Sequence, residues 1–239
     1  MPTPASETYP PLISLAVHEL RTPVGVVSGY LRMLLRDTVE PLTPRQRKLI
    51  EDADRSCVRM AAIIAELSDV GKLDGDVIGL ASQPVDVLPL VKDVVAQTHE
   101  GSDRDVHLTV RADDKPAMVI GDATRLRASF DAVFRSVLRE KPGPAAVVAD
   151  CRRVQIDGED CLVVVVADEP ALDEAFTRPR RPFVETRGGM GLALPLARRV
   201  IDGHRGRLES PQPVAGQTEA EDRLARSSAI ITIPIARGE

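Results

Sequence analysis

The segment ISLAVHELRTPVGVVSGYLRML, residues 13–34, decides the architecture of the first part of this 239-residue chain. Its apolar residues recur in alternating steps of four and three, the heptad pattern of a helix that packs along one narrow seam. The seam positions are Ile13, Val17, Leu20, Val24, Val27, Leu31 and Leu34. We therefore predict one long helix that starts between Tyr9 and Leu12.

A second helix with the same pattern follows a connection rich in helix breakers. Thr43 is predicted as its N-cap and Pro44 as its first residue, and Gly71 and Gly75 are predicted to end it. Its seam positions are Leu49, Ala53, Ser56, Met60, Ile63, Leu67 and Val70. Two helices with narrow apolar seams cannot bury them alone, so we expect an antiparallel hairpin that dimerises into a four-helix bundle.

After residue 80 the pattern changes to short Val-rich strands that alternate with helices, which indicates an α/β sandwich and makes the whole chain α+β. Asp157-Gly158 is a hairpin signal. We predict a mobile loop over 169–187, a polar linker over 210–227, and a mixed sheet with helices on one face. The predicted strands are 84–87, 106–111, 116–120, 147–156, 161–167 and 229–235, and the predicted helices are 88–98, 123–139 and 191–203.

Composition excludes several classes of protein. The formal net charge of −5 and the 3% of aromatic residues argue against nucleic-acid binding. The longest apolar run, Cys161–Ala167, is far shorter than a membrane span, and the N-terminus does not resemble a signal peptide. We therefore expect a cytoplasmic protein without direct membrane insertion. The three cysteines lack CxxC spacing and are interpreted as reduced packing residues.

The clearest chemical motif is His18-Glu19-Leu20-Arg21-Thr22-Pro23. His18 lies one position off the heptad seam, so its imidazole is expected on the bundle surface. A solvated imidazole beside a carboxylate can accept a phosphoryl group, because Glu19 can orient the ring or take its proton. The alternative from the residues alone is an ordinary solvated histidine.

This hexapeptide resembles the H-box of the two-component sensor histidine kinases. The resemblance implies that His18 is autophosphorylated, that Glu19 acts as a base, and that Thr22 positions water for dephosphorylation of a response regulator. It also implies a homodimer. Residues 12–73 look like the dimerisation and phosphotransfer domain, and 83–239 look like a divergent ATP-binding domain shared with gyrase, Hsp90 and MutL. Residues 1–11 are then a disordered N-terminus and 74–82 a linker.

The ATP-binding resemblance rests on two motifs. Gly121–Arg127 resembles the stretch before the family's N-box, and Gly188–Leu194 is similar to the glycine-rich G2 box at the end of the ATP lid. Glycines at a helix start let backbone N–H groups approach phosphate, which implies nucleotide contacts at Gly189 and Gly191. A simple strand–loop–helix joint also needs glycine.

The same domain departs from the family in two boxes. Ser136 stands where the family has a magnesium-chelating Asn, and the basic residue three positions later is kept as Arg139. The resemblance implies that both belong to the nucleotide site, with Ser136 as a poor magnesium ligand because a hydroxyl binds the ion less well than an amide oxygen. Asp168 follows a hydrophobic strand, where it would accept a hydrogen bond from the adenine amino group or, alternatively, cap a turn. Pro170 and Leu172 occupy positions that are glycine in the family. The implied cofactors are therefore ATP and Mg²⁺, bound weakly.

The proline- and arginine-rich segment holds Arg178, Arg180, Arg181 and Arg187. These residues either place charge near the triphosphate or form a solvated loop, and we favour the loop. Altogether the chain is predicted to be a histidine protein kinase that transfers phosphoryl from ATP to His18 and then to an Asp of a response regulator. The alternative is a pseudokinase that acts as a phosphotransfer or phosphatase partner, or as a dimeric adaptor, without using ATP.

Overall fold

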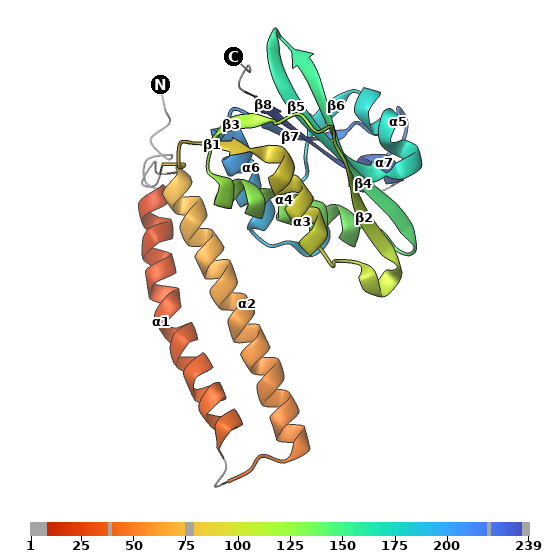
Figure 1. The fold of residues 1–239 in the computed structure, drawn as a ribbon. Helices are drawn as coiled ribbons and strands as arrows, with labels where there is room; N and C mark the ends of the chain where they lie inside the picture. The colour runs from red at the N-terminus through yellow and green to blue at the C-terminus, as the bar shows by residue number, and fades with distance from the viewer. Residues whose placement is uncertain (1–8, 38–39, 75–78, 219–220, 236–239) are drawn as a thin grey trace. The chain divides into compact units, whose positions relative to one another are not determined.

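The computed structural model describes residues 9–37, 40–74, 79–218 and 221–235. The chain divides into two compact units, Met1–Gly79 and Leu80–Glu239. The first is the predicted helical hairpin and the second is an α/β domain (Figure 1).

The hairpin consists of α1 (Tyr9–Arg36) and α2 (Pro44–Asp74). Thr43 caps α2 as predicted: its hydroxyl accepts a bond from the Gln46 N–H at 3.3 Å, and the Gln46 side chain accepts one from the Thr43 N–H at 3.0 Å. α1 begins at Tyr9, within the predicted range of Tyr9 to Leu12, so residues 9–11 belong to the helix and not to a disordered N-terminus. The predicted end of α2 at Gly71 is wrong, because the helix runs through Gly71 to Asp74. Residues 1–8 and Gly75 lie outside the described residues.

The heptad seams of the hairpin are only partly buried. Val17 of α1 and Val70 of α2, both predicted seam residues, are buried. The prediction is wrong at Ser56 and Ile63, which are exposed, because the next residues, Cys57 and Ile64, are the buried ones. By contrast Leu20, Val27 and Leu34, which are seven residues apart, are each 45–48% exposed. The apolar stripe on α1 therefore covers two faces, one against α2 and one left open within a single chain.

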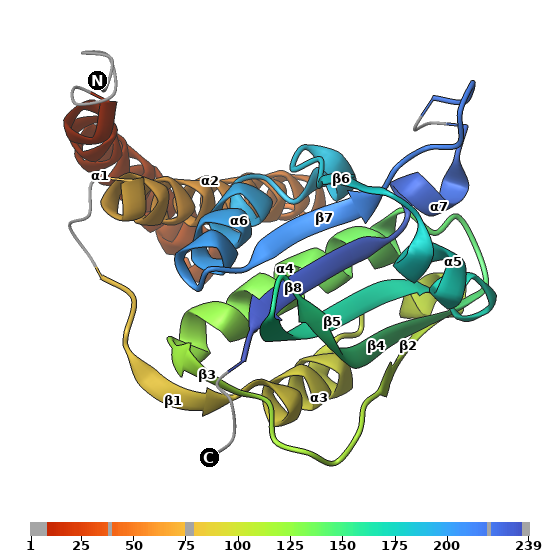
Figure 2. The same ribbon diagram turned by 90° about the horizontal axis from the view of Figure 1, so that it is seen from above.

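In the second unit a six-stranded sheet has the order β2-β4-β5-β8-β7-β6, and β1 and β3 form a separate antiparallel pair (Figure 2). β2 and β4 are parallel and the other neighbours are antiparallel, which confirms the predicted mixed sheet. Asp157 and Gly158 both have positive φ in the predicted β4–β5 turn. The strands are β1 (Gln83–Asp86), β2 (Val106–Arg111), β3 (Met118–Gly121), β4 (Ala145–Ile156), β5 (Glu159–Asp168), β6 (Arg180–Pro182), β7 (Arg207–Pro211) and β8 (Ala229–Pro234).

Helices α3 (Val87–Gln97), α4 (Ala123–Arg139) and α6 (Ala193–Gly203) lie on one side of the sheet (Figure 1). Each has one apolar face, which includes Leu126, Phe130, Phe134 and Val137 on α4 and Leu194 and Ile201 on α6. The side chains of Cys151 and Cys161 are buried in the central strands, and burial raises the pKa of the Cys151 thiol to about 12. An unreactive packing role follows for Cys151.

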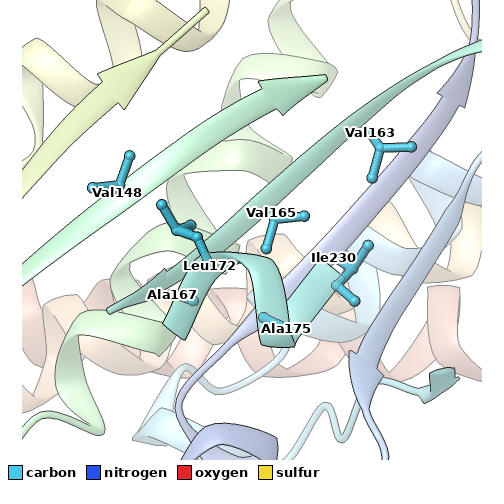
Figure 3. Close-up of a cluster of buried hydrophobic side chains, with 7 residues drawn as sticks. All are labelled: Val148, Val163, Val165, Ala167, Leu172, Ala175 and Ile230. Atoms are coloured by element: carbon cyan, nitrogen blue, oxygen red, sulfur yellow. The ribbon is translucent and has the colours of Figure 1, made fainter. Parts of the chain in front are cut away.

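The prediction of helices on one face alone is wrong, because α5 (Leu172–Thr177) covers the other face. Leu172 and Ala175 of α5 join a buried cluster with Val163, Val165 and Ile230 of the sheet (Figure 3). The segment 169–187 is therefore not a loop. It contains the 3₁₀ turn η2 (Glu169–Ala171), α5, the edge strand β6 and a second turn, η3 (Arg187–Gly189).

The predicted linker over 210–227 is also partly structured. β7 extends to Pro211, and a short helix, α7 (Arg223–Arg226), precedes β8. The Asp222 side chain caps α7 by accepting from the Ala225 N–H at 3.0 Å. It also accepts from the Val214 N–H at 2.9 Å, so this one buried carboxylate holds residue 214 close to the start of α7.

A histidine joins the start of α4 to the end of α6. The Nε2 atom of His204 accepts a hydrogen bond from the Asp122 N–H at 2.9 Å, and its Nδ1 lies 2.6 Å from the Val200 carbonyl oxygen. The ring lies directly against Gly121, where a Cβ would overlap it. Asp122 then caps α4 by accepting from the Arg125 N–H at 3.0 Å.

We expect Gly121→Ala to destabilise the second unit by about 2–4 kcal/mol, because the His204 ring must move and its bond to Asp122 is lost. Gly143→Ala is the matched control, since a Cβ there meets nothing within 4 Å. The chain has no tryptophan and both tyrosines precede residue 31, so unfolding is best followed by calorimetry. Equal melting of the two variants would show that the close approach does not matter.

Candidate functional site

The three H-box residues with expected chemical roles, His18, Glu19 and Thr22, are exposed to solvent on α1. Val17 is 4% exposed and faces the hairpin interior, which turns the adjacent His18 outward. The side chains of His18 and Glu19 are 80% and 72% exposed, and His18 Nδ1 lies 3.4 Å from Glu19 Oε1. Thr22 is also exposed one turn further on. An imidazole with this exposure is accessible to a partner protein.

Pro23 lies inside α1, which continues on both sides of it. Proline has no N–H, so the carbonyl of Glu19 lacks the usual intrahelical hydrogen bond from position 23. The backbone is thereby loosened within one turn of the phosphoacceptor candidate.

In the second unit Ser136 is fully buried on α4. Its hydroxyl donates to the Val133 carbonyl at 2.7 Å. Gly188 packs so closely on this side of α4 that a Cβ on it would lie 3.0 Å from the Ser136 Cα. The hydroxyl is therefore turned into the helix and not toward an open metal position.

Arg139, at the end of α4, holds the glycine segment directly. Its Nη1 donates to the carbonyl oxygens of Gly188 at 3.2 Å and Gly189 at 3.4 Å. Its Nε lies 3.1 Å from a carboxylate oxygen of Glu100. Gly188, Gly189 and Gly191 all have φ between 58° and 66°, a region that favours glycine. The structure thus brings Ser136, Arg139 and the glycines together.

Asp168 ends β5 and forms an ion pair with Lys141. The Lys141 Nζ lies 2.8 Å from Asp168 Oδ1 and donates to the Ser227 carbonyl at 3.0 Å and the Ser227 hydroxyl at 2.8 Å. The Lys141 side chain is 1% exposed and that of Asp168 is 24% exposed. Burial lowers the pKa of Lys141, and the Asp168 carboxylate opposes that shift.

These residues do not fit a magnesium ion. The Ser136 hydroxyl is bonded to the backbone, and the described residues contain no group of three or more His, Cys, Asp and Glu side chains suited to a metal. The groups that the resemblance assigns to a nucleotide are present but occupied. Asp168 faces Lys141, and Arg139 faces two backbone carbonyls.

Two of the arginines predicted in a solvated loop, Arg178 and Arg187, instead make buried or half-buried contacts that hold the segment in place. Arg187 is 8% exposed, and its guanidinium bonds to the Ser228 carbonyl at 3.2 Å and the Ser210 hydroxyl at 2.7 Å. It also stacks on Phe183, with Cζ 3.8 Å from the ring centroid. Arg178 pairs with the buried Asp222 at 2.6 Å. Sequence reasoning missed these roles, and that of Lys141, because the partners are distant along the chain.

Known protein families and relatives support the interpretation of residues 18–23 as an H-box. Residues 12–76 match the family model of the His Kinase A (phospho-acceptor) domain. The signal transduction histidine-protein kinase BarA of Escherichia coli K12 is 28% identical over 213 residues, which cover 84% of this chain and 23% of BarA. The sensor protein kinase PmrB of Pseudomonas aeruginosa is 27% identical over 235 residues, covering 95% of this chain and 48% of PmrB. The chain thus spans less than half the length of these curated relatives.

Solved structures share the fold across both units. A crystal structure of full-length ShkA in complex with AMPPNP superposes with a TM-score of 0.70 at 20% identity, covering 96% of this chain and 46% of ShkA. The histidine kinase AdeS of Acinetobacter baumannii gives a TM-score of 0.52 at 16% identity, covering 93% of this chain and 98% of that one. The H-box, the phosphoacceptor match and the named relatives agree in supporting the resemblance to the two-component sensor histidine kinases.

Among the described helices, none combines the length and the hydropathy required to cross a membrane.

We expect Arg187→Met to lower the melting temperature strongly, at a cost of about 3 kcal/mol or more, because the buried Ser210 hydroxyl and Ser228 carbonyl lose their partner. Arg111→Met is the matched control: Arg111 is 55% exposed and pairs at 3.1 Å with the equally exposed Glu169, so its loss should cost less than about 1 kcal/mol. Calorimetry of both variants compares the two. Similar melting temperatures of the two variants would mean that the buried contacts of Arg187 do not stabilise the fold.

Proposed function

We propose that the chain is a histidine protein kinase module in which His18 accepts a phosphoryl group and passes it to an aspartate of a response regulator. The observation that carries this proposal is the exposed His18–Glu19 pair within the matched phosphoacceptor domain. ATP is the proposed donor. Relatives with kinase names and the AMPPNP complex of ShkA support it over the adaptor alternative.

We propose different roles for the two ring nitrogens of His18. Nδ1 faces Glu19, so the carboxylate can hold the Nδ1 proton and later accept it. Nε2 then carries the free lone pair and attacks phosphorus, forming a P–N bond as the bond to the leaving oxygen breaks. In the second transfer a carboxylate oxygen of the regulator attacks phosphorus, the P–N bond breaks, and neutral imidazole is restored.

Thr22 is the proposed positioning residue for the reverse, dephosphorylating reaction. It lies one helical turn from His18 and is exposed. Its hydroxyl can orient a water molecule toward a phosphoaspartate docked on the same face of α1.

Asp168, Arg139, Gly189 and Gly191 are the residues proposed to hold the nucleotide, through the adenine amino group and the phosphates. Their present contacts must open first, because Asp168 and Arg139 are engaged within the chain. We assign Ser136 no metal contact, because its hydroxyl is buried and bonded to the helix backbone.

A homodimer through the hairpin is proposed from its open apolar stripe. Leu20, Val27 and Leu34 repeat every seven residues on α1, and Leu49 and Ile63 of α2 are also exposed. A second copy of the hairpin would cover these side chains in a four-helix bundle. Apolar residues repeated every seven positions pack well against the same repeat on another helix, so a second copy of the hairpin is a suitable partner.

Incubation with radiolabelled ATP tests the phosphoacceptor. We expect His18→Gln to lose the label entirely, because glutamine has no nucleophilic nitrogen. His99→Gln and His107→Gln are matched controls, since both are exposed histidines with polar partners outside the H-box. The label should be acid-labile and alkali-stable. Label retained in His18→Gln would refute the assignment.

Thr22→Ala is expected to leave the transfer from His18 to the regulator intact and to slow regulator dephosphorylation. Equal loss of both reactions would instead indicate a structural role for Thr22.

Val27→Glu is expected to dissociate the dimer, because it places charge in the buried bundle core. Val27 is 48% exposed in one chain, so the hairpin itself should survive. Sedimentation at tens of micromolar measures the oligomeric state, with Arg45→Glu on the exposed surface of α2 as the control. A monomeric wild type would remove the basis of the proposal.

A further inference from the structure

Three consecutive residues at the end of α4, Arg139–Lys141, contact the glycine segment, Asp168 and the end of α7. Arg139 donates to the carbonyls of Gly188 and Gly189. Glu140 accepts from the Gly188 N–H at 3.2 Å and lies 3.4 Å from Arg226. Lys141 pairs with Asp168 and bonds to Ser227. We call residues 139–141 the latch.

Lys141 makes the most complete of these contacts. Its Nζ donates hydrogen bonds to the Ser227 carbonyl at 3.0 Å and the Ser227 hydroxyl at 2.8 Å, and it forms an ion pair with Asp168 Oδ1 at 2.8 Å. The Ser227 contacts hold the ammonium group beside the carboxylate. The Lys141 side chain is 1% exposed, so removal of its anionic partner would leave a buried, uncompensated charge.

An adenine amino group is a neutral donor, whereas Lys141 is a charged one. The attraction between the Lys141 ammonium and the Asp168 carboxylate at 2.8 Å therefore competes with a hydrogen bond from the base to Oδ1. The second oxygen, Oδ2, lies 3.7 Å from the exposed Arg223. Cationic side chains of the chain itself thus lie next to the carboxylate that, in the proposed function, accepts a hydrogen bond from adenine.

We propose that the latch closes the nucleotide position from within, and that Lys141 is the positioning residue that sets nucleotide affinity by holding Asp168. This inference rests on the proposed function for its choice of ligand. Nucleotide binds when the Lys141–Asp168 pair separates and the Arg139 and Glu140 contacts release the glycine segment. Affinity is accordingly weak in the wild-type chain.

The test is calorimetric titration of ATP into the full chain, with GTP in parallel and each with and without Mg²⁺. Lys141→Met keeps the length and burial of the side chain but removes its charge. We expect it to bind ATP at least about tenfold more tightly than the wild type, with little gain for GTP. Lys92→Met is the control for a lost lysine charge, since Lys92 is 46% exposed and its nearest acid, Asp114, is 3.9 Å away; it should leave affinity unchanged.

Two further variants test whether the gain in ATP affinity comes from the freed Asp168 carboxylate. Adding Asp168→Asn to Lys141→Met should abolish the gain, because the freed carboxylate is its source. If Lys141→Met does not fold, Lys141→Gln serves instead, since its amide can still donate to the Ser227 carbonyl. Equal ATP affinity in wild type and the Lys141 variant, whether tight or undetectable, overturns the inference.

Labelling of His18 in the same preparations separates this inference from the proposed function. Equal affinities with normal His18 labelling refute the latch and leave the kinase proposal standing. Tighter ATP binding by Lys141→Met without any His18 labelling refutes ATP as the phosphoryl donor and supports the latch.

Discussion

The burial of β5 on both faces is the constraint on which the second unit depends. Leu162, Val164 and Val166 alternate along this strand with Val163, Val165 and Ala167, and all six are at most 1% exposed. One set faces the side covered by α4 and α6, and the other lies in the cluster closed by α5. Leaving Val163, Val165, Leu172 and Ile230 in water would cost about 6–12 kcal/mol, comparable to the whole stability of a domain.

This constraint explains why the segment after Asp168 departs from the family pattern. Leu172 stands where the resemblance expects glycine, and it is 2% exposed in the cluster that covers the sheet. A residue that anchors α5 cannot also belong to an open glycine-rich loop. The rest of the segment is then drawn onto the sheet edge as β6, and its arginines bond to Asp222, Ser210 and backbone carbonyls. The segment is therefore anchored to the sheet by a few buried residues: Leu172, Ala175, Phe183 and Arg187.

The hairpin differs from the second unit in that its exposed side chains matter more than its buried ones. Its proposed function depends on what it leaves exposed: the imidazole of His18 on one part of α1 and an apolar stripe on another. Both are consequences of helical periodicity, because the seven-residue repeat that turns Val17 inward also turns His18 outward. The second unit instead depends on what it buries, including the charges of Lys141 and Arg187. Each of these charges is stable inside because several acceptors surround it.

The sequence by itself determined the hairpin, the H-box and most strands and helices of the sheet, since those depend on periodicity and on caps formed by near neighbours. β2 and α4 have the boundaries that their patterns predict, and Thr43 caps α2. Short elements such as α5, β6 and α7 were missed because segments of three to six residues carry too little periodicity. The tertiary structure alone decided that Lys141 holds Asp168 and Ser227, the latter 86 residues away. Local patterns specify which face of an element is apolar, but which charges meet inside depends on how distant segments pack.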